Sequence, residues 1–413
     1  LSFDSAPAGR VNTNGTLTLG NSTFIYNHSV ASTQGIVLSG NISVNSSATA
    51  DFTNSGAGSG RITLGAAARV FDIGTSANMN VGWIIASTST AGTLTKNGTG
   101  VLTLSGNNTY TGTTRINAGT LEITGSGRLG GGAYAAAISN NGSFIIGSNN
   151  NQTLSGIISG TGSLTKNGSG VLTLSGNSTY SGDTVINTGT LQIATTGRLG
   201  AGNYSGNITN TGDFVFGSTS NQTLSGIISG TGSLTKNGTG TLTISGNNSY
   251  TGTTTVRNGT ITLAHANALG SGGEITFTGG GLQYGSGITT DISSRIKNST
   301  ATILIDTNGN NVSFDSAVDS TNTLGLTKNG TGTLTLSGNN TYNGTTSINA
   351  GTLEITSTGR LGAGTYAANI TNNGSLIMGS NSAQTLSGII SGTGALTQNA
   401  ASTLTFTGNN TYT

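Results

Sequence analysis

Hydrophobic and polar residues alternate along most of the chain in short runs. Residues 17–19, 101–104 and 120–123 each carry Leu or Ile at every second position, with Thr or Glu between them. Strict alternation over a few residues is the pattern of a half-buried β-strand. Helical spacing of apolar residues is hard to find, and the Gly, Thr, Ser and Asn that fill the other positions are poor helix formers. The pattern predicts an all-β chain of short strands joined by turns.

The same run of strands and turns returns at long range. A motif that starts Leu-Thr-Lys-Asn-Gly begins near residues 92, 162, 232 and 325, and a degenerate copy begins near 394. Its lysine column reads Lys96, Lys166, Lys236 and Lys328, then Gln398, so the intervals are 70, 70, 92 and 70 residues. A fixed period of this size indicates a solenoid. Because the long interval exceeds the others by the length of a single coil, we interpret it as four coils and each shorter interval as three.

These intervals predict a parallel β-helix of about 18 coils, with about 22–24 residues in each coil. In such a fold each coil buries its inward Leu, Ile, Val and Phe against the coils above and below. We expect two regions in the chain. Residues 1–91 alternate without the motif and are predicted to form irregular coils or an N-terminal cap, and residues 92–413 form the repeat β-helix.

Composition narrows the function classes. Only 26 of the 413 residues are charged, 6% of the chain, against roughly a quarter in an ordinary soluble domain. Cysteine is absent, which removes disulfides and Cys-based metal sites, and we expect no cofactor. The net charge of +2 without a basic block argues against nucleic acid as a partner. No apolar run is long enough for a membrane-spanning helix. The alternation and the near-zero net charge also argue against disorder.

The motif resembles a known family. Residues 94–100, 102–112 and 116–121 together are similar to the autotransporter-associated β-strand repeat of type V secreted bacterial proteins. The resemblance covers roughly residues 92–413. It implies a right-handed parallel β-helix that is secreted to the bacterial cell surface. Passenger regions of this family adhere to surfaces, join cells to each other or build matrix such as biofilm, and some carry protease domains or glycosylated Ser and Thr.

The last copy of the motif is incomplete. It departs from the others at Gln398, Ala400 and Ala401 and stops at Thr413 without a polar capping element. We therefore expect the native chain to continue beyond this residue.

Two columns of the repeat are candidate contacts for a partner. We predict weak partner-contact columns at the lysines Lys96, Lys166, Lys236 and Lys328 and at the tyrosines Tyr110, Tyr180, Tyr250 and Tyr342. The ammonium groups could contact an anionic glycan, and the phenol rings could stack on sugars. The structural alternative is that each lysine only solubilises an exposed corner, while each tyrosine packs over a turn with its hydroxyl in water.

Candidate chemistry elsewhere in the chain is sparse. The densest charged region runs from Asp291 to Asp319, in the predicted extra coil, and would suit a glycan-binding or glycan-processing site if it were not simply a solvated face. The two histidines, His28 and His265, have no acidic neighbour that would suggest a catalytic pair, so we do not expect an enzyme.

A third class is suggested by threonine. Thr-x-Thr pairs such as 241/243 and 333/335 are similar to those of ice-binding solenoids, but they do not occur in every coil.

The sequence therefore predicts a structural extracellular rod or fibre segment of a large bacterial surface protein, which mediates adhesion, cell–cell contact or assembly of a matrix. Its expected partners are other copies of itself, through end-to-end or lateral association, or surface glycans. The alternative is a glycan-binding or glycan-processing β-helix with its site near residues 291–319.

Overall fold

The computed structural model describes residues 2–3, 10–13, 15–26, 35–55, 59–65, 67–88 and 92–413. The chain divides into two compact units, Leu1–Phe214 and Val215–Thr413, which we call unit 1 and unit 2 and describe separately. In the described ranges the regular structure consists of β-strands and four three-residue 3-10 segments. None of these segments is a helix long and apolar enough to cross a membrane. The predicted all-β class is confirmed.

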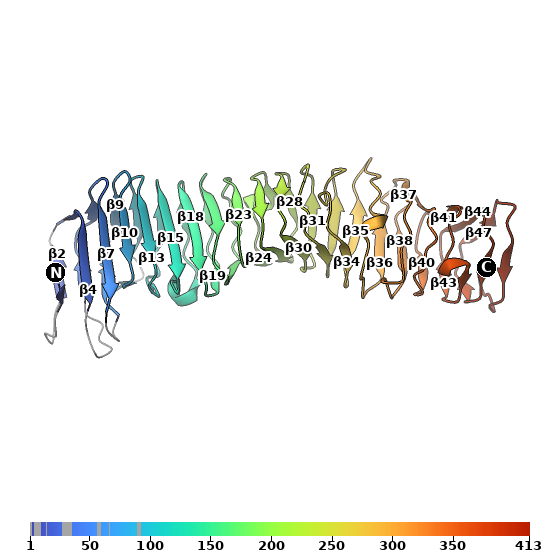
Figure 1. Cartoon of the computed structure of the whole chain (residues 1–413), viewed down its shortest axis with the longest axis horizontal. Helices are drawn as coiled ribbons and strands as arrows, with labels where there is room; N and C mark the ends of the chain where they lie inside the picture. Colours follow the sequence, from blue (N-terminus) through green and yellow to red (C-terminus); the bar gives the residue numbers. More distant parts are fainter. Residues whose placement is uncertain are drawn as a thin grey trace. The chain divides into compact units, whose positions relative to one another are not determined.

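The strands of unit 1 wind around three faces, and neighbouring strands on a face pair in parallel (Figure 1, blue to green). The first face holds β1 (Ser2–Phe3), β4 (Ser22–Tyr26), β7 (Thr49–Asn54), β10 (Asn78–Val81), β13 (Val101–Leu104), β15 (Thr120–Gly125), β18 (Ser143–Ser148), β21 (Ser163–Lys166), β23 (Thr184–Ile186) and β26 (Ile208–Asn210). The second face holds β2 (Arg10–Thr13), β5 (Gly35–Leu38), β8 (Arg61–Leu64) and β11 (Ile84–Ser87), then an irregular interval, then β16 (Ala133–Tyr134), β19 (Gln152–Leu154), β22 (Val171–Leu174) and β24 (Thr190–Thr195). The third face holds β3 (Leu17–Leu19), β6 (Ile42–Val44), β9 (Arg69–Ile73), β12 (Leu94–Asn97), β14 (Thr114–Ile116), β17 (Ile138–Asn140) and β20 (Ile158–Ser159).

Unit 2 repeats this plan. One face holds β28 (Gln222–Leu224), β31 (Thr241–Ile244), β33 (Thr260–Leu263), β35 (Gly281–Tyr284), β36 (Ile303–Asp306), β38 (Leu326–Asn329), β40 (Thr346–Ile348), β43 (Ile370–Asn372) and β46 (Ile390–Ser391). The other sheets hold β30 (Ser233–Lys236), β32 (Thr254–Val256) and β34 (Ile275–Phe277); β37 (Val312–Phe314), β39 (Thr333–Leu336), β41 (Thr352–Ser357), β44 (Ser375–Ser380) and β47 (Ala395–Gln398); and β42 (Thr365–Tyr366), β45 (Gln384–Leu386) and β48 (Leu404–Phe406). The remaining elements are β25 (Asn203–Tyr204), β27 (Asp213–Ser218), β29 (Ile228–Ser229), η1 (Gly130–Gly132), η2 (Gly200–Gly202), η3 (Ser293–Arg295) and η4 (Gly362–Gly364).

The core is built from equivalent inward positions stacked in register. In unit 1, the side chains of Met79, Leu102, Leu121, Phe144 and Leu164 follow one another on the first face, and all of them are buried. Each buried side chain of this size contributes about 1.5–3 kcal/mol. The outward residues between them are polar or half-buried, as the alternation predicted. The fold is therefore a parallel β-solenoid, as predicted, and it makes about 18 turns in the described residues.

The predicted size of the repeat in coils is wrong. On the third face of unit 1, Leu94, Thr114, Ile138 and Ile158 are successive partners, so the middle one of these three turns is longer than the other two. The next copy of the motif starts at Leu164, which lies on the first face instead. One repeat of the shorter interval therefore spans ten faces, or three and a third turns, rather than three coils. Turn length also varies more than predicted, because corners differ in length.

The predicted insertion of one whole coil in the longest interval is confirmed. In unit 1 the motif strands β15 and β21 are separated on their face by one strand, β18. In unit 2 the equivalent strands β33 and β38 are separated by two, β35 and β36. A full extra turn preserves parallel pairing with the turns on either side.

Candidate functional site

The repeat lysines, Lys96, Lys166, Lys236 and Lys328, are buried in the structure, with at most 1% of each residue exposed. Their ammonium groups point into the corner between two successive turns and donate to backbone carbonyls. Lys96 Nζ lies 2.8 Å from the carbonyl oxygens of Asn97 and Gly98 and 3.3 Å from that of Ala118, one turn further on. Each lysine therefore joins two turns through main-chain acceptors.

The other repeat lysines make the same kind of contact. Lys328 Nζ donates to Asn329 and Gly330 at 3.0 and 2.8 Å, and to Ala350 of the next turn at 3.2 Å. Lys166 donates to Gly168 and Thr188, and Lys236 donates to Gly238 and Asn258. Lys236 also lies 5.7 Å from the centre of the Phe216 ring.

A glycine on the following turn leaves room for the ammonium group. Gly189 has φ +69°, and a Cβ at this position would lie 2.9 Å from Lys166 Nζ and 2.4 Å from the carbonyl oxygen of Gly168. L-residues rarely adopt this backbone region, so the position suits glycine for two independent reasons. The glycine of the repeat and its lysine are parts of one structure.

Burial lowers the pKa of the repeat lysines. Desolvation brings the pKa of Lys96, Lys236 and Lys328 from 10.5 to about 8, and it lowers that of Lys166 as well. The predicted lysine column at the surface is therefore wrong, in both its partner-contact and its corner-solubilising form. The four side chains hold turns together from inside, and copies in one unit lie on different faces.

The repeat tyrosines, Tyr110, Tyr180, Tyr250 and Tyr342, are also buried, with at most 1% exposed. In three copies each packs edge-on against a second tyrosine from the next turn, and the ring centres of Tyr110 and Tyr134 are 5.7 Å apart. Burial raises the pKa of Tyr110 well above its usual value and that of Tyr134 to about 12. The predicted tyrosine column, with rings available to sugars or hydroxyls in water, is corrected: the rings form part of the core.

A threonine connects the two phenols of each pair. The hydroxyl of Thr114 lies 2.8 Å from the hydroxyls of both Tyr110 and Tyr134. Because Tyr134 donates its own proton to the carbonyl of Gly112, Thr114 must donate to Tyr134, and Tyr110 must donate to Thr114. The result is a one-way chain of hydroxyls that ends on the main chain.

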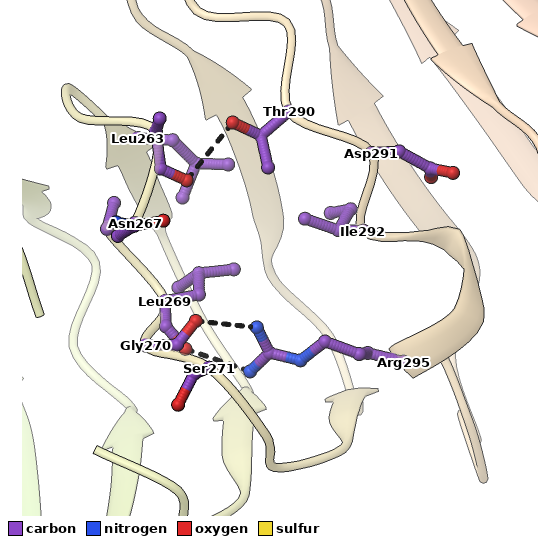
Figure 2. Close-up of a pocket in the computed structure, with 11 residues that line it drawn as sticks. Leu263, Asn267, Leu269, Gly270, Ser271, Thr290, Asp291, Ile292 and Arg295 are labelled. Carbon is purple, nitrogen blue, oxygen red and sulfur yellow. Dashed lines mark hydrogen bonds between the residues drawn. The ribbon is translucent and has the colours of Figure 1, made fainter. Parts of the chain in front are cut away.

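The extra turn of unit 2 creates a pocket of about 200 Å³ against the preceding turn. Its apolar wall comes from Leu263, Leu269 and Ile292, all of them buried. Figure 2 shows Arg295 reaching across from the extra turn to the segment around Leu269, while Thr290 closes the opposite side. Three of its lining residues, Asp291, Ile292 and Arg295, belong to the charged region 291–319 that the sequence marked as a candidate glycan site, and the others precede that region.

Arg295 is anchored by three backbone carbonyls. Its Nε donates to Gly273 at 2.7 Å, Nη1 to Gly270 at 3.1 Å and Nη2 to Leu269 at 2.8 Å. Among the described residues the salt bridge formed is Lys297–Asp319, at 2.5 Å, so no carboxylate there pairs with Arg295.

The carboxylates of the charged region serve as caps. Asp291 accepts the backbone N–H of Ser293 at 2.8 Å and that of Asp315, on the next turn, at 3.0 Å. Asp306 accepts from the amide of Gln283 at 2.9 Å. In the described part of the chain no three His, Asp or Glu side chains gather as a metal site would require. The acids of residues 291–319 thus connect turns and are not arranged as an acid–base pair.

Comparison with known proteins agrees with the repeat pattern. The family model of the passenger-associated-transport-repeat matches residues 94–123, 164–193, 234–263 and 326–355. The chain is 34% identical, over 84% of its length, to the adhesin BmaC autotransporter of Brucella suis biovar 1. The chain is an autotransporter passenger repeat protein. It spans 12% of the length of that relative, and no solved structure matches it.

Passengers of this type are secreted and displayed on the bacterial cell surface, so the predicted localisation is confirmed. The family match and the geometry coincide. Each matched segment begins at the strand that carries a repeat lysine and contains the repeat tyrosine, its threonine and the glycine beside the ammonium group. The passenger motif is therefore a set of internal contacts between turns.

Sequence analysis of the passenger missed three kinds of internal contact. Asn108 is buried, accepts a hydrogen bond from Ile85 N–H and donates to two carbonyls. Thr114 bridges the two phenols. Gln152 caps Leu129 of the preceding turn at both its N–H and its C=O. The signal in the sequence was that these polar residues recur at fixed positions of the motif. Such recurrence indicates an internal hydrogen bond, because a solvent-exposed position of a repeat accepts many different polar side chains.

The remaining candidates from the sequence are the two histidines and the Thr-x-Thr pairs. His265 accepts a hydrogen bond from the backbone N–H of Asn267 at 3.0 Å and so caps its own turn, while His28 lies outside the described residues. The Thr-x-Thr pairs 241/243 and 333/335 lie on different sheets of unit 2, in β31 and β39, so they do not build one flat array.

Proposed function

We propose that this passenger segment is a non-enzymatic structural part of a surface adhesin, which provides a stiff scaffold and many weak contacts along its outer faces. The observation that carries the proposal is that the ammonium groups of the repeat lysines and the phenols of the repeat tyrosines are buried and bind other turns of the solenoid. The outward positions of the strands therefore present mainly the short hydroxyl side chains of Thr and Ser. Adhesion as the role is supported by the printed name of the relative from Brucella suis.

The outer faces offer regular rows of hydroxyl groups. In unit 2, Thr223, Thr243 and Thr262 are successive partners on one face. Strand spacing places such neighbours about 4.8 Å apart. Rows of this kind suit broad contact with hydroxylated or peptide surfaces, in which no single side chain dominates.

A surface-display experiment tests adhesion. The chain is displayed on a non-adherent bacterial host, and attachment to host-cell monolayers and sedimentation of the culture are measured. A matched control displays a variant in which the four repeat lysines are changed to Met, because it retains the outer faces' composition but weakens the turns. Attachment or clumping only with the folded chain supports the proposal. A folded, displayed chain that produces neither effect would refute it.

Self-association is the finer form of the proposal and needs a separate test. Electron microscopy of the purified chain over a concentration series distinguishes the outcomes. Filaments or bundles that grow with concentration support assembly between copies. Single particles at every concentration refute it and leave adhesion to an outside partner.

Glycan binding near residues 291–319 is the second candidate, favoured by the pocket beside Arg295. Glycan processing has no comparable support. The carboxylates that it would need are engaged as caps, as described for Asp291 and Asp306.

A further inference from the structure

The pocket beside Arg295 differs from the same place in the other copies. In copies 1 and 4, a glutamine from the next turn caps a leucine of the corner. Gln152 Oε1 accepts from Leu129 N–H at 2.7 Å, and its Nε2 donates to Leu129 C=O at 3.1 Å. Gln384 does the same for Leu361, at 2.8 and 3.1 Å.

In copy 3 the equivalent leucine is Leu269, and no glutamine of the described residues caps it. Nη2 of Arg295 donates to Leu269 C=O at 2.8 Å, which replaces one half of the glutamine contact. A guanidinium group has no acceptor atom, so Arg295 cannot receive a hydrogen bond from Leu269 N–H. The acceptor oxygen that glutamine supplies in copies 1 and 4 is therefore missing from this corner.

The same copy has also lost a ring. In copies 1, 2 and 4 the second tyrosine of the pair stands five residues after the corner leucine, whereas in copy 3 the residue five positions after Leu269 is Glu274. The loop from this corner to the next strand is also three residues shorter in copy 3 than in copy 1. The described pocket of about 200 Å³ lies at this corner. That volume equals roughly seven water molecules at ~30 Å³ each, enough for one sugar ring and less than the ~300 Å³ at which drug-sized sites begin.

Two charged residues line the pocket, Arg295 and Asp291, and Figure 2 shows the Asp291 carboxylate directed away from Arg295. The three carbonyls use one N–H each on Nε, Nη1 and Nη2, so two of the five N–H donors of the guanidinium remain, one on each terminal nitrogen. Figure 2 shows the carbonyls of Leu269 and Gly270 at the end of the guanidinium, so the two remaining donors lie on its opposite side edges. One such charged donor can bind one oxygen of a carboxylate. The apolar wall of Leu263, Leu269 and Ile292 would face the C–H groups of the ring that carries it.

We infer that this pocket binds the carboxylate of an acidic sugar, a uronate residue of a surface polysaccharide. The carboxylate pairs with Arg295 and supplies the acceptor oxygen that the corner lacks, and the pyranose ring fills the space beside the apolar wall. The inference deepens the proposed adhesion and rests on it for the source of the sugar. With one charged contact and one small ring, a millimolar dissociation constant is expected.

Amide chemical shifts of the purified, isotope-labelled chain test the inference. Sodium D-glucuronate should shift the amides of residues 263–271 and 290–295 with saturation in the millimolar range. The methyl ester of glucuronic acid keeps the ring and removes the charge, so it should bind at least about tenfold more weakly. Sodium acetate, which keeps the charge and removes the ring, should also be at least about tenfold weaker. Equal binding of acetate would overturn the sugar as ligand, and equal binding of the ester would overturn the carboxylate.

Two variants localise the effect. Arg295→Gln removes the cation of the pocket and should weaken glucuronate binding by about tenfold or more. Lys297→Gln removes a neighbouring cation outside the pocket and should leave binding unchanged. Wild-type affinity in Arg295→Gln, or no shift with 50 mM glucuronate (about 50-fold above the expected constant), would overturn the inference. Because the ester and acetate comparisons use the unmodified chain, the test stands even if Arg295→Gln fails to fold.

The outcome is separable from that of the display experiment. A failed titration with intact attachment overturns the pocket and leaves adhesion in place. Binding of glucuronate by a chain that confers no attachment overturns adhesion and leaves the pocket.

Discussion

Thr114→Val probes the hydroxyl chain between turns in unit 1. Valine has nearly the shape of threonine, so the change removes one hydroxyl and leaves packing almost intact. The Tyr110 hydroxyl loses the acceptor 2.8 Å away, and the Tyr134 hydroxyl loses a donor at 2.8 Å while it keeps its bond to Gly112. Both rings are buried, so water does not replace these bonds. A buried group left without its partner costs about 1–3 kcal/mol, and we expect a loss of stability of this size.

The assay is urea unfolding followed by tyrosine fluorescence and circular dichroism, with Thr114→Ser as the matched control that keeps the hydroxyl. The double variant Thr114→Val/Tyr110→Phe should be less destabilised than the sum of the single variants, since the phenylalanine removes the hydroxyl that valine leaves unpaired. The reasoning would be refuted if Thr114→Val cost less than ~0.5 kcal/mol, within the range of an ordinary surface substitution, or if the two changes were additive.

Three further outcomes are expected. Gly189→Ala should destabilise the chain by about 1–3 kcal/mol, because it places a Cβ against Lys166 Nζ and Gly168 C=O at φ +69°; an unchanged urea midpoint would contradict this. The repeat lysines with a pKa near 8 bind protons less tightly in the folded chain than in the unfolded chain, where the lysine pKa is 10.5. The free energy of unfolding should therefore rise as the pH goes from 8 to 10.5, and this gain is lost as the pH falls back through 8. A melting temperature that stays flat from pH 7 to 10 would argue against their burial. Lys297→Met should cost at most about 1 kcal/mol in the same melts, because the side chains of Lys297 and Asp319 are both about 30% exposed; a larger loss would show a structural role for the pair.

Much of the fold follows from the sequence. Alternation identified strands such as β13, and the one long interval between motif copies identified the extra turn. The number of faces per repeat did not follow, because a period counts residues and not strands. Corners of different length make the turn from Leu94 to Thr114 shorter than the turn from Thr114 to Ile138 in the same copy. Register between turns was needed to count them.

The candidate site was harder to predict, for a chemical reason. The partners of Lys96 are main-chain carbonyls, which every residue carries and no sequence pattern displays. Without a nearby carboxylate in the motif, a lysine is naturally assigned to the surface. The recurrent glycine at 119 and 189 was the available clue, since a position that tolerates no Cβ marks a close approach. The pocket at Arg295 depends on a missing glutamine, and an absence in one copy is meaningful only once the role of Gln152 is known.

The ten-face repeat has a consequence for how such passengers vary in length. Copies 1 and 2 begin on different faces of unit 1. Duplication or loss of one copy of the shorter interval would therefore rotate the turns that follow it about the solenoid axis by about a third of a turn. Gain or loss of three copies would return those turns to their original orientation. Copy number would thus set the direction in which a downstream surface feature faces, as well as the length of the passenger. Two strains that differ by one repeat would present the same feature in different directions.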